Sequence, residues 1–297
     1  MKFKINAIFS LLKEAFQQWQ KDKASLLAAA LAYYTVFSVT PLLVIAIAIV
    51  GAVFGQDEAR TSILAQVNEL VGEQGAHAIE MALNNANQPQ VGSIASLISV
   101  IVLFIGASGV FAQLQEALNI IWNVRVKPSL GIWGFIRKRL LSFGMVLIIG
   151  FLLLVSLVLS AVLSGISKVE IELLENFTSA IQMLNLVNFV ISFGFITVLF
   201  ALIYKYLPDA KIRWQDVWVG AIVTTLLFGL GKYLIGLYLG RGSMGSAYGA
   251  AGSLIIFLAW VFYSAQILLF GAELTQVYAR RYGRKIRPSE NAELTKY

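Results

Sequence analysis

Six stretches of this sequence are each long enough and apolar enough to cross a lipid bilayer as a helix. Such a helix needs roughly 20 mostly apolar residues, and the third stretch, residues 140–166, contains no charged residue. The composition agrees, because 58% of the residues are hydrophobic and only 13% are charged, whereas soluble domains carry about 25% charged residues. We therefore predict an all-α polytopic membrane protein with six transmembrane helices, which cover residues 26–54, 91–121, 140–166, 181–207, 214–239 and 247–278.

Basic residues are distributed unevenly over the connections between these stretches. Nineteen lysines and arginines lie in the N-terminal segment, the second and fourth connections and the C-terminal segment, whereas three lie in the other connections. Cytoplasmic loops of membrane proteins carry the excess of Lys and Arg, so we predict that both ends of the chain are cytoplasmic. The net charge of +7 then reflects orientation in the membrane. We expect anionic lipid headgroups, rather than nucleic acid, to be the partner of the basic face.

The chain is predicted to form one transmembrane domain over residues 1–297, with three segments outside the spans. Residues 1–25 have apolar residues at helical spacing, which is typical of an amphipathic helix in the cytoplasmic interface, although a helix packed onto the bundle fits the same pattern. Residues 55–90 are predicted to form one or two helices on the outer face, and residues 280–297 a basic cytoplasmic tail. The apolar positions of the first segment are Ile5, Ile8, Phe9, Leu12, Phe16 and Trp19.

The sequence lacks residue types on which several classes of enzyme depend. It has no cysteine, which excludes disulfides and thiolate chemistry, and it has a single histidine, His77, whereas zinc and non-haem iron sites usually need two or three imidazoles. No phosphate loop, nucleophile elbow or HExxH motif is present. We therefore expect no catalytic residue, no cofactor and no metal site, and we expect that the protein is not an enzyme.

Candidate functional residues are the polar groups inside the spans, because an ionisable side chain at the bilayer centre costs on the order of 2.5–3.5 kcal/mol. Glu116 and Glu273 lie near the inner ends of their spans, and each shares a helix face with other polar residues. We predict that they line an inward-facing cavity, although pairing with nearby arginines at helix ends explains the same positions. The predicted lining comprises Gln113, Glu116, Asn119, Gln266 and Glu273, with Tyr33 and Tyr34 from the first span.

Two further features predict a hinge in the first span and a segment that binds lipid headgroups. Pro41 lies in the middle of the first span, where a proline removes a backbone hydrogen bond and kinks the helix, so we predict a hinge there; many purely structural helices are kinked in the same way. Arg137, Lys138 and Arg139 follow an aromatic stretch just before the third span, which is typical of a segment at headgroup level. We predict that these three residues bind anionic headgroups.

Blocks spread over nearly the whole chain resemble the YihY/BrkB family. They are residues 32–38 with Pro41, 111–122, 206–209, 248–253 and 271–274; each block is weak alone, but the set is specific. The resemblance implies a multi-pass protein of the bacterial inner membrane with six spans. The family has also carried a ribonuclease name, but a chain without cysteine, with one histidine and without an inner acidic cluster offers RNA neither a site nor access.

The resemblance leaves the function open, because the family has been linked to serum resistance, to lipid movement in the envelope and to cation/proton exchange. We expect transport of a lipid or an amphipathic envelope precursor across the inner membrane. A cation/proton antiporter, with Glu116 or Glu273 as the proton carrier, is the alternative, and it predicts cation flux that disappears on Glu→Gln substitution. A third candidate is a non-transporting scaffold that assembles with itself or with envelope partners, and it predicts that such variants keep their function.

Overall fold

Helices make up most of the structure, a computed structural model that describes residues 2–86, 93–127, 144, 178–240, 252–283 and 286–295. The helices are α1 (Lys2–Lys21), α2 (Ala24–Phe54), α3 (Gln56–Ala86), α4 (Ser93–Ile121), α6 (Thr178–Tyr206), α7 (Trp214–Gly240) and α9 (Gly252–Tyr282). The short strands are β1 (Val124–Val126), β2 (Ala210–Lys211), β3 (Arg287–Pro288) and β4 (Ala292–Leu294). The described part of the chain is therefore mostly helical, with these strands and short turns between the helices.

The helices fall on the apolar stretches of the sequence. α2, α4, α6, α7 and α9 coincide with five of the predicted spans, whereas the third predicted span, residues 140–166, lies outside the described residues except for residue 144. Over the described residues, three helices are long and apolar enough to cross a membrane: Ala24–Phe54, Trp214–Leu234 and Leu254–Tyr282. Ser192–Tyr206 forms a shorter apolar helix. The structure thus confirms a helical chain with candidate membrane spans.

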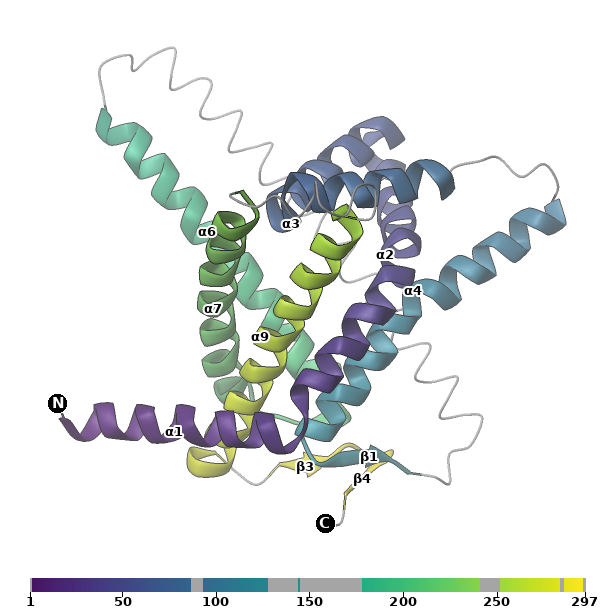
Figure 1. Cartoon of the computed structure of the whole chain (residues 1–297). Helices are drawn as coiled ribbons and strands as arrows, with labels where there is room; N and C mark the ends of the chain where they lie inside the picture. Colours follow the sequence, from purple (N-terminus) through teal and green to yellow (C-terminus); the bar gives the residue numbers. More distant parts are fainter. Residues whose placement is uncertain are drawn as a thin grey trace.

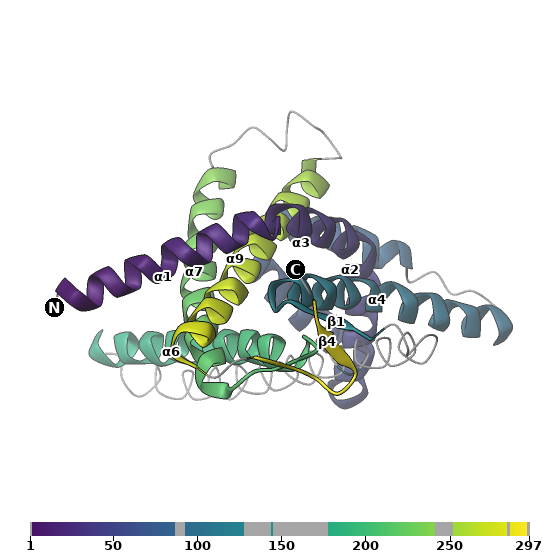
Figure 2. The same ribbon diagram turned by 90° about the horizontal axis from the view of Figure 1, so that it is seen from below.

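Three helices run along the length of the molecule between two helices that lie across its ends. In Figure 1, α2, α7 and α9 run between α1 at the lower end and α3 at the upper end, and both termini lie at the α1 end. Figure 2, the view from below, shows α1 passing across α9. α9 contacts α1, α2, α3, α4 and α7, so it is the central helix of the described structure.

Two antiparallel strand pairs join segments that are far apart in the sequence. β1 pairs with β4, with Val124 opposite Leu294, and β2 pairs with β3, so the second and fourth connections lie against the C-terminal segment. α1 lies at the same end, because Glu14 forms ion pairs with Arg280 and Arg281. All four segments that the charge pattern assigns to one side of the membrane therefore lie together.

α3 reverses direction, although it is helical over its whole length. The Arg60 guanidinium donates a hydrogen bond to the Asn84 side chain, 24 residues further on, and a straight helix would separate these residues by about 36 Å at 1.5 Å per residue. The segment therefore folds into two arms, which lie across the ends of the upright helices in Figure 1. Ile63 and Ile79, one from each arm, are buried in one core with residues of α2. The predicted outer segment is thus a helical hairpin.

α7 and α9 cross at two reciprocal contacts between a glycine and a threonine. Thr275 of α9 packs against Gly220 of α7, and Thr224 of α7 packs against Gly271 of α9, so closely that a Cβ atom on either glycine would overlap the threonine hydroxyl. Each hydroxyl donates to a carbonyl of its own helix, Thr224 to Gly220 and Thr275 to Gly271, both at 2.7 Å. Small residues allow transmembrane helices to approach closely, so these four positions set the distance between α7 and α9.

α2 and α4 cross where Ser38 of α2 meets the backbone of α4. The Ser38 hydroxyl donates to the Gly106 carbonyl (2.6 Å) and accepts from the Val110 amide (3.2 Å). A group inserted between two such backbone partners, four residues apart, bends a helix, and Figure 1 shows that α4 changes direction along its length. Pro41 packs against Gly106, and α2 stays helical through Pro41, so a hinge at Pro41 stays a prediction.

Candidate functional site

The Glu273 carboxyl of α9 is buried without the donors that an ionised carboxylate needs. The residue is 0% exposed, and apart from the Asp22 carboxyl neither of its carboxyl oxygens has a hydrogen-bond partner among the described residues. The Asp22 carboxyl, in the turn between α1 and α2, faces it. Because burying an unpaired charge is very costly, the pair needs a physical explanation.

A shared proton provides that explanation. Ionised carboxylates only accept hydrogen bonds, so two facing carboxyl groups can bond to each other only when one of them is protonated. Burial raises the pKa of the Asp22 carboxyl above its ordinary value, while the contact with Glu273 and the charge of Lys21 act in the opposite direction. The N-terminus of α2, which begins at Ala24, adds a partial positive charge beside Asp22. The arrangement therefore suits a pair that holds one proton and one negative charge.

Further polar groups with incomplete hydrogen bonding surround the pair. Gln266, two turns before Glu273 on α9, donates through Nε2 to the Ser25 hydroxyl of α2 (3.2 Å). Its Oε1 atom and the Oε1 atom of Gln276 are buried with no hydrogen-bond partner in the described part of the chain. We call Asp22, Ser25, Gln266, Glu273 and Gln276 the carboxyl cluster. It lies at the corner where α1 and α2 meet α9.

α1 is held against α9 beside the carboxyl cluster. The Glu14 carboxylate pairs with the guanidinium groups of Arg280 and Arg281, and Ala15 is fully buried against α9. Burial alone would raise the pKa of Glu14, but the two arginines outweigh that effect and lower the pKa below its ordinary value. Arg280 is also the cation whose charge acts on Glu273. The docking of α1 and the charge of the cluster are therefore electrostatically connected.

The apolar stripe of α1 faces away from the bundle. Ile8 and Phe9 are 60% and 70% exposed, and Leu12 and Phe16 are also exposed. An exposed apolar stripe on a helix whose other face is polar is typical of a helix that lies in the membrane interface. α1 thus packs onto α9 with one face and presents its apolar face outward, and its position in the membrane interface stays a prediction.

A second polar network joins α4 to the connection between α6 and α7. The Asp209 carboxylate accepts hydrogen bonds from Gln115 (3.2 Å) and from Asn119 (3.0 Å), and the Asp209 amide donates to the Asn119 side chain (2.8 Å). The Asp209 carbonyl accepts from the Ser289 amide of the C-terminal segment (2.9 Å). This buried carboxylate has the donors that Glu273 lacks, so we assign the network a structural role.

We expect Asn119→Ala to destabilise the protein by about 2–4 kcal/mol, because it leaves both the buried Asp209 carboxylate and the Asp209 amide short of a partner. The unfolding midpoint of the purified protein in detergent measures the effect. Gln113→Ala, at a half-buried position of the same helix, is the control, and we expect it to change stability by less than about 0.5 kcal/mol. Equal losses in the two variants would contradict the assignment.

The structure places the predicted lining residues of α4 in different environments. Glu116 is exposed and Gln113 is half-buried, whereas the buried polar positions of this helix are Ser108, Gln115 and Asn119. Glu116 is thus an exposed carboxyl and Glu273 has no exposed surface, and one lining shared by the two stays a prediction.

The remaining predicted positions are distributed as follows. Tyr33 and Tyr34 are 61% and 42% exposed on α2, and their role in a lining stays a prediction. The basic residues expected to bind headgroups lie outside the described residues: Arg137, Lys138 and Arg139.

Among the residues that the structure describes, no group of three or more His, Cys, Asp or Glu side chains is placed to hold a metal ion. The polar residues of the two networks that were not predicted from the sequence are Asp22, Ser25, Gln115, Asp209 and Gln276.

Comparison with known families assigns the chain. The family model described as virulence factor BrkB matches residues 15–295. The chain belongs to the BrkB family. The resemblance seen in the sequence blocks is thereby confirmed, and the match includes every residue of the carboxyl cluster.

Relatives of this BrkB-family chain carry the name UPF0761 membrane protein. One from Paraburkholderia xenovorans is 26% identical over 97% of this chain and 64% of its own length. One from Halorhodospira halophila is 32% identical over 88% of this chain and 55% of its own length, and one from Mannheimia succiniciproducens is 28% identical over 88% and 86%. The chain thus spans less than two thirds of several relatives that it matches. No solved structure matches it.

Proposed function

We propose that this protein is a proton-linked transporter of the bacterial inner membrane and that Asp22 and Glu273 bind the proton. The observation that carries the proposal is the fully buried Glu273 carboxyl, which faces Asp22 and has no other hydrogen-bond donor among the described residues. Ionisable groups within spans are costly, and transporters use them as proton relays. A purely structural contact between helices does not need such a pair, whereas a proton carrier does.

The proposal includes six spans with both ends of the chain in the cytoplasm. It is supported by the helices on five predicted spans and by the position of the two termini, the second connection and the fourth connection at one end of the molecule. In this orientation the carboxyl cluster lies near the cytoplasmic ends of α2 and α9, and α3 lies on the outer side. A proton then reaches the pair from the cytoplasm when the corner between α1 and α2 moves.

The cargo that we propose is a lipid or an amphipathic envelope precursor. In this orientation the apolar stripe of α1 lies at the cytoplasmic membrane interface, where lipids and amphipathic precursors partition. The basic face at the same end of the molecule attracts anionic headgroups. Arg280 acts on Glu273 and also pairs with Glu14 of α1. Loss of the shared proton adds a negative charge beside Arg280 and so competes with Glu14. In this way the protonation of the pair is linked to the docking of the helix that meets the cargo.

The experiment that tests the proposal is flipping of a headgroup-labelled phospholipid in proteoliposomes, with and without an imposed pH gradient. We expect flipping above that of protein-free vesicles, at a rate that depends on the gradient. An absence of flipping under both conditions, with protein shown to be folded, would remove lipid as the cargo. A rate independent of the gradient would remove the proton linkage.

A cation/proton antiporter is the second candidate, because the carboxyl cluster contains unpartnered oxygen acceptors. The Oε1 atoms of Gln266 and Gln276 are buried without partners in the described part of the chain, and hard cations prefer carboxylate and carbonyl oxygens. Cation flux that depends on pH, without lipid flipping in the same vesicles, would favour this candidate. An absence of both activities would favour the envelope-assembly scaffold.

A further inference from the structure

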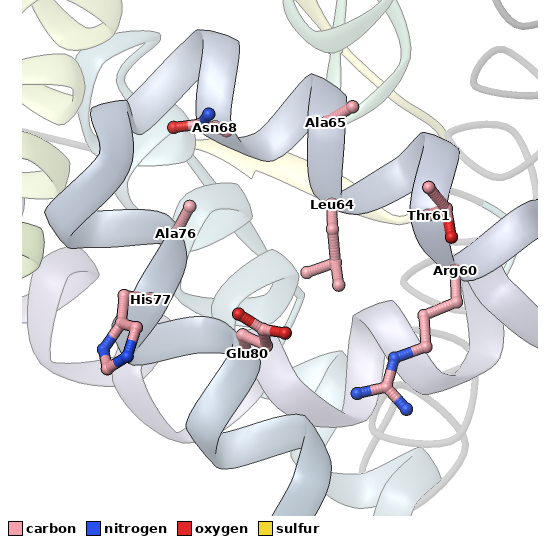
Figure 3. A pocket seen from close by; sticks show the side chains of 8 residues that line it. All are labelled: Arg60, Thr61, Leu64, Ala65, Asn68, Ala76, His77 and Glu80. Carbon is pink, nitrogen blue, oxygen red and sulfur yellow. The ribbon is translucent and has the colours of Figure 1, made fainter.

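The two arms of α3 line an open pocket at the end of the molecule opposite α1. Its volume is about 590 Å³, within the range of roughly 300–1,000 Å³ that is usual for small-molecule sites. The first arm contributes Arg60, Leu64 and Asn68, and the second contributes His77 and Glu80. Figure 3 shows these side chains on the two arms around a common space. The pocket therefore combines charged, neutral polar and apolar groups.

Arg60 and Glu80 place charges of opposite sign around this pocket without pairing with each other. The Arg60 guanidinium donates to Asn84 instead, and no ion pair within the described residues involves Glu80. In Figure 3, Leu64 points into the space between the arms, the Glu80 carboxylate lies beside it, and Arg60 extends from the other side. A ligand complementary to these groups carries both an anionic and a cationic group.

We propose that the α3 pocket binds a phosphate–ammonium zwitterion of the phosphoethanolamine type, with the phosphate on Arg60 and the ammonium on Glu80. Guanidinium groups form strong charge-assisted hydrogen bonds to phosphate oxygens, and Leu64 offers an apolar contact to the carbon atoms between the two charged groups. This binding does not depend on transport, because the pocket and the carboxyl cluster lie at opposite ends of the molecule.

The zwitterion has two sources, a lipid headgroup and free phosphoethanolamine. Val53 and Phe54, at the end of α2 that leads into α3, are 65% and 38% exposed. Exposed apolar residues at the end of a candidate span bring lipid close to the pocket. The experiment below separates the two sources.

The test is calorimetric titration of the full chain, purified in detergent without phosphatidylethanolamine. The probes are dihexanoyl-phosphatidylethanolamine, free phosphoethanolamine and dihexanoyl-phosphatidylglycerol, which has the phosphate but no ammonium. We expect Glu80→Gln to weaken binding of the ethanolamine probe by about tenfold or more, as expected for one lost charge-assisted contact. The same variant should bind the glycerol probe at least as well as the wild type. Glu58→Gln, an exposed acidic position of the first arm outside the pocket, should change neither.

Each result then supports or overturns the proposal. Ethanolamine binding that depends on Glu80 supports it, and the free or the short-chain form that binds more tightly identifies the source. Glycerol binding that persists in Glu80→Gln shows that the variant is folded. An equal change for both lipid probes, or ethanolamine binding that Glu80→Gln leaves unchanged, would overturn it. So would a wild type that binds neither ethanolamine probe.

Discussion

Replacing Glu273 by glutamine is expected to stabilise the protein and to abolish the proton linkage of transport. Glutamine has nearly the same size, and its amide can donate to Asp22 without a shared proton. A hydrogen bond that satisfies a buried polar group without a shared proton recovers about 1–3 kcal/mol, and 1 kcal/mol shifts the unfolding midpoint by roughly 2–4 °C in domains of 150–250 residues. We therefore expect a higher unfolding midpoint in detergent, together with a transport rate that no longer responds to a pH gradient.

The pH dependence of stability should change in the same variant. The pKa of Asp22 in the folded protein is raised above its ordinary value of 3.8. Between these two pKa values, Asp22 is protonated more often in the folded protein than in the unfolded chain. The contribution of Asp22 to the free energy of unfolding therefore falls as the pH rises from 3.8 through the raised pKa, whereas Glu14, whose pKa is lowered, contributes with the opposite sign in both proteins. In Glu273→Gln the new amide donor favours the charged form of Asp22. The free energy of unfolding of this variant should therefore fall less over the same pH range. Unfolding midpoints measured over this pH range compare the two proteins.

Glu116→Gln is the matched control, because it makes the same substitution at an exposed carboxyl of α4. We expect it to change stability by less than about 0.5 kcal/mol and to leave the response to the pH gradient intact. A Glu273→Gln protein that keeps the wild-type pH response would reduce the carboxyl cluster to a structural role. A lower unfolding midpoint in that variant would show that the pair is satisfied in a way that glutamine cannot reproduce.

The positions of the helices could be predicted because they depend on local properties of the chain. The predicted first span, residues 26–54, matches α2 (Ala24–Phe54), and the fifth, residues 214–239, matches α7 (Trp214–Gly240). In both cases an apolar run ends at polar or glycine residues, so length and hydropathy suffice. The third predicted span, residues 140–166, lies outside the described structure and stays a prediction.

The grouping of Glu116 with Asn119 depends on the phase of a helix rather than on its position, and the role of Glu116 in a lining stays a prediction. The sequence analysis grouped Gln113, Glu116 and Asn119 by spacing alone. The buried polar residues of α4 are Ser108, Gln115 and Asn119, which are seven and four residues apart and follow the helical repeat. Gln115 would have been found if the buried face had been set first from the apolar positions, which include Phe111, Leu118 and Trp122.

Other features could not be predicted from the sequence because they depend on contacts between distant segments. Asp22 stands between two lysines and has no local feature that distinguishes it from a solvated residue, yet the turn from α1 to α2 places it opposite Glu273. Asp209 lies in a short connection with no local feature that marks it as buried, and only the packing of that connection against α4 supplies its donors. The reversal of α3 likewise becomes evident only from the contact between Arg60 and Asn84.

Gly220→Ala is expected to destabilise the protein by about 3 kcal/mol or more, because overpacking at a rigid contact forces helices apart. The added Cβ would overlap the Thr275 hydroxyl, and it would lie 2.9 Å from the Thr275 Cβ and 3.0 Å from the Gly271 carbonyl. One of these neighbours is backbone, so a change of rotamer cannot relieve the contact. The yield of monodisperse protein in detergent and its unfolding midpoint measure the loss.

Two further variants separate this clash from a general sensitivity of α7 to alanine. Gly229 lies on the same helix with nothing within 4 Å of an added Cβ, so Gly229→Ala should be neutral or should stabilise the helix by up to about 1 kcal/mol. Adding Thr275→Gly to Gly220→Ala removes the hydroxyl and the Cβ that obstruct the new methyl group, so the double variant should recover most of the lost stability. Recovery in the double variant would show that the distance between α7 and α9 is set at this pair of residues. If Gly229→Ala were as harmful as Gly220→Ala, the loss would come from helix α7 itself and not from its crossing with α9.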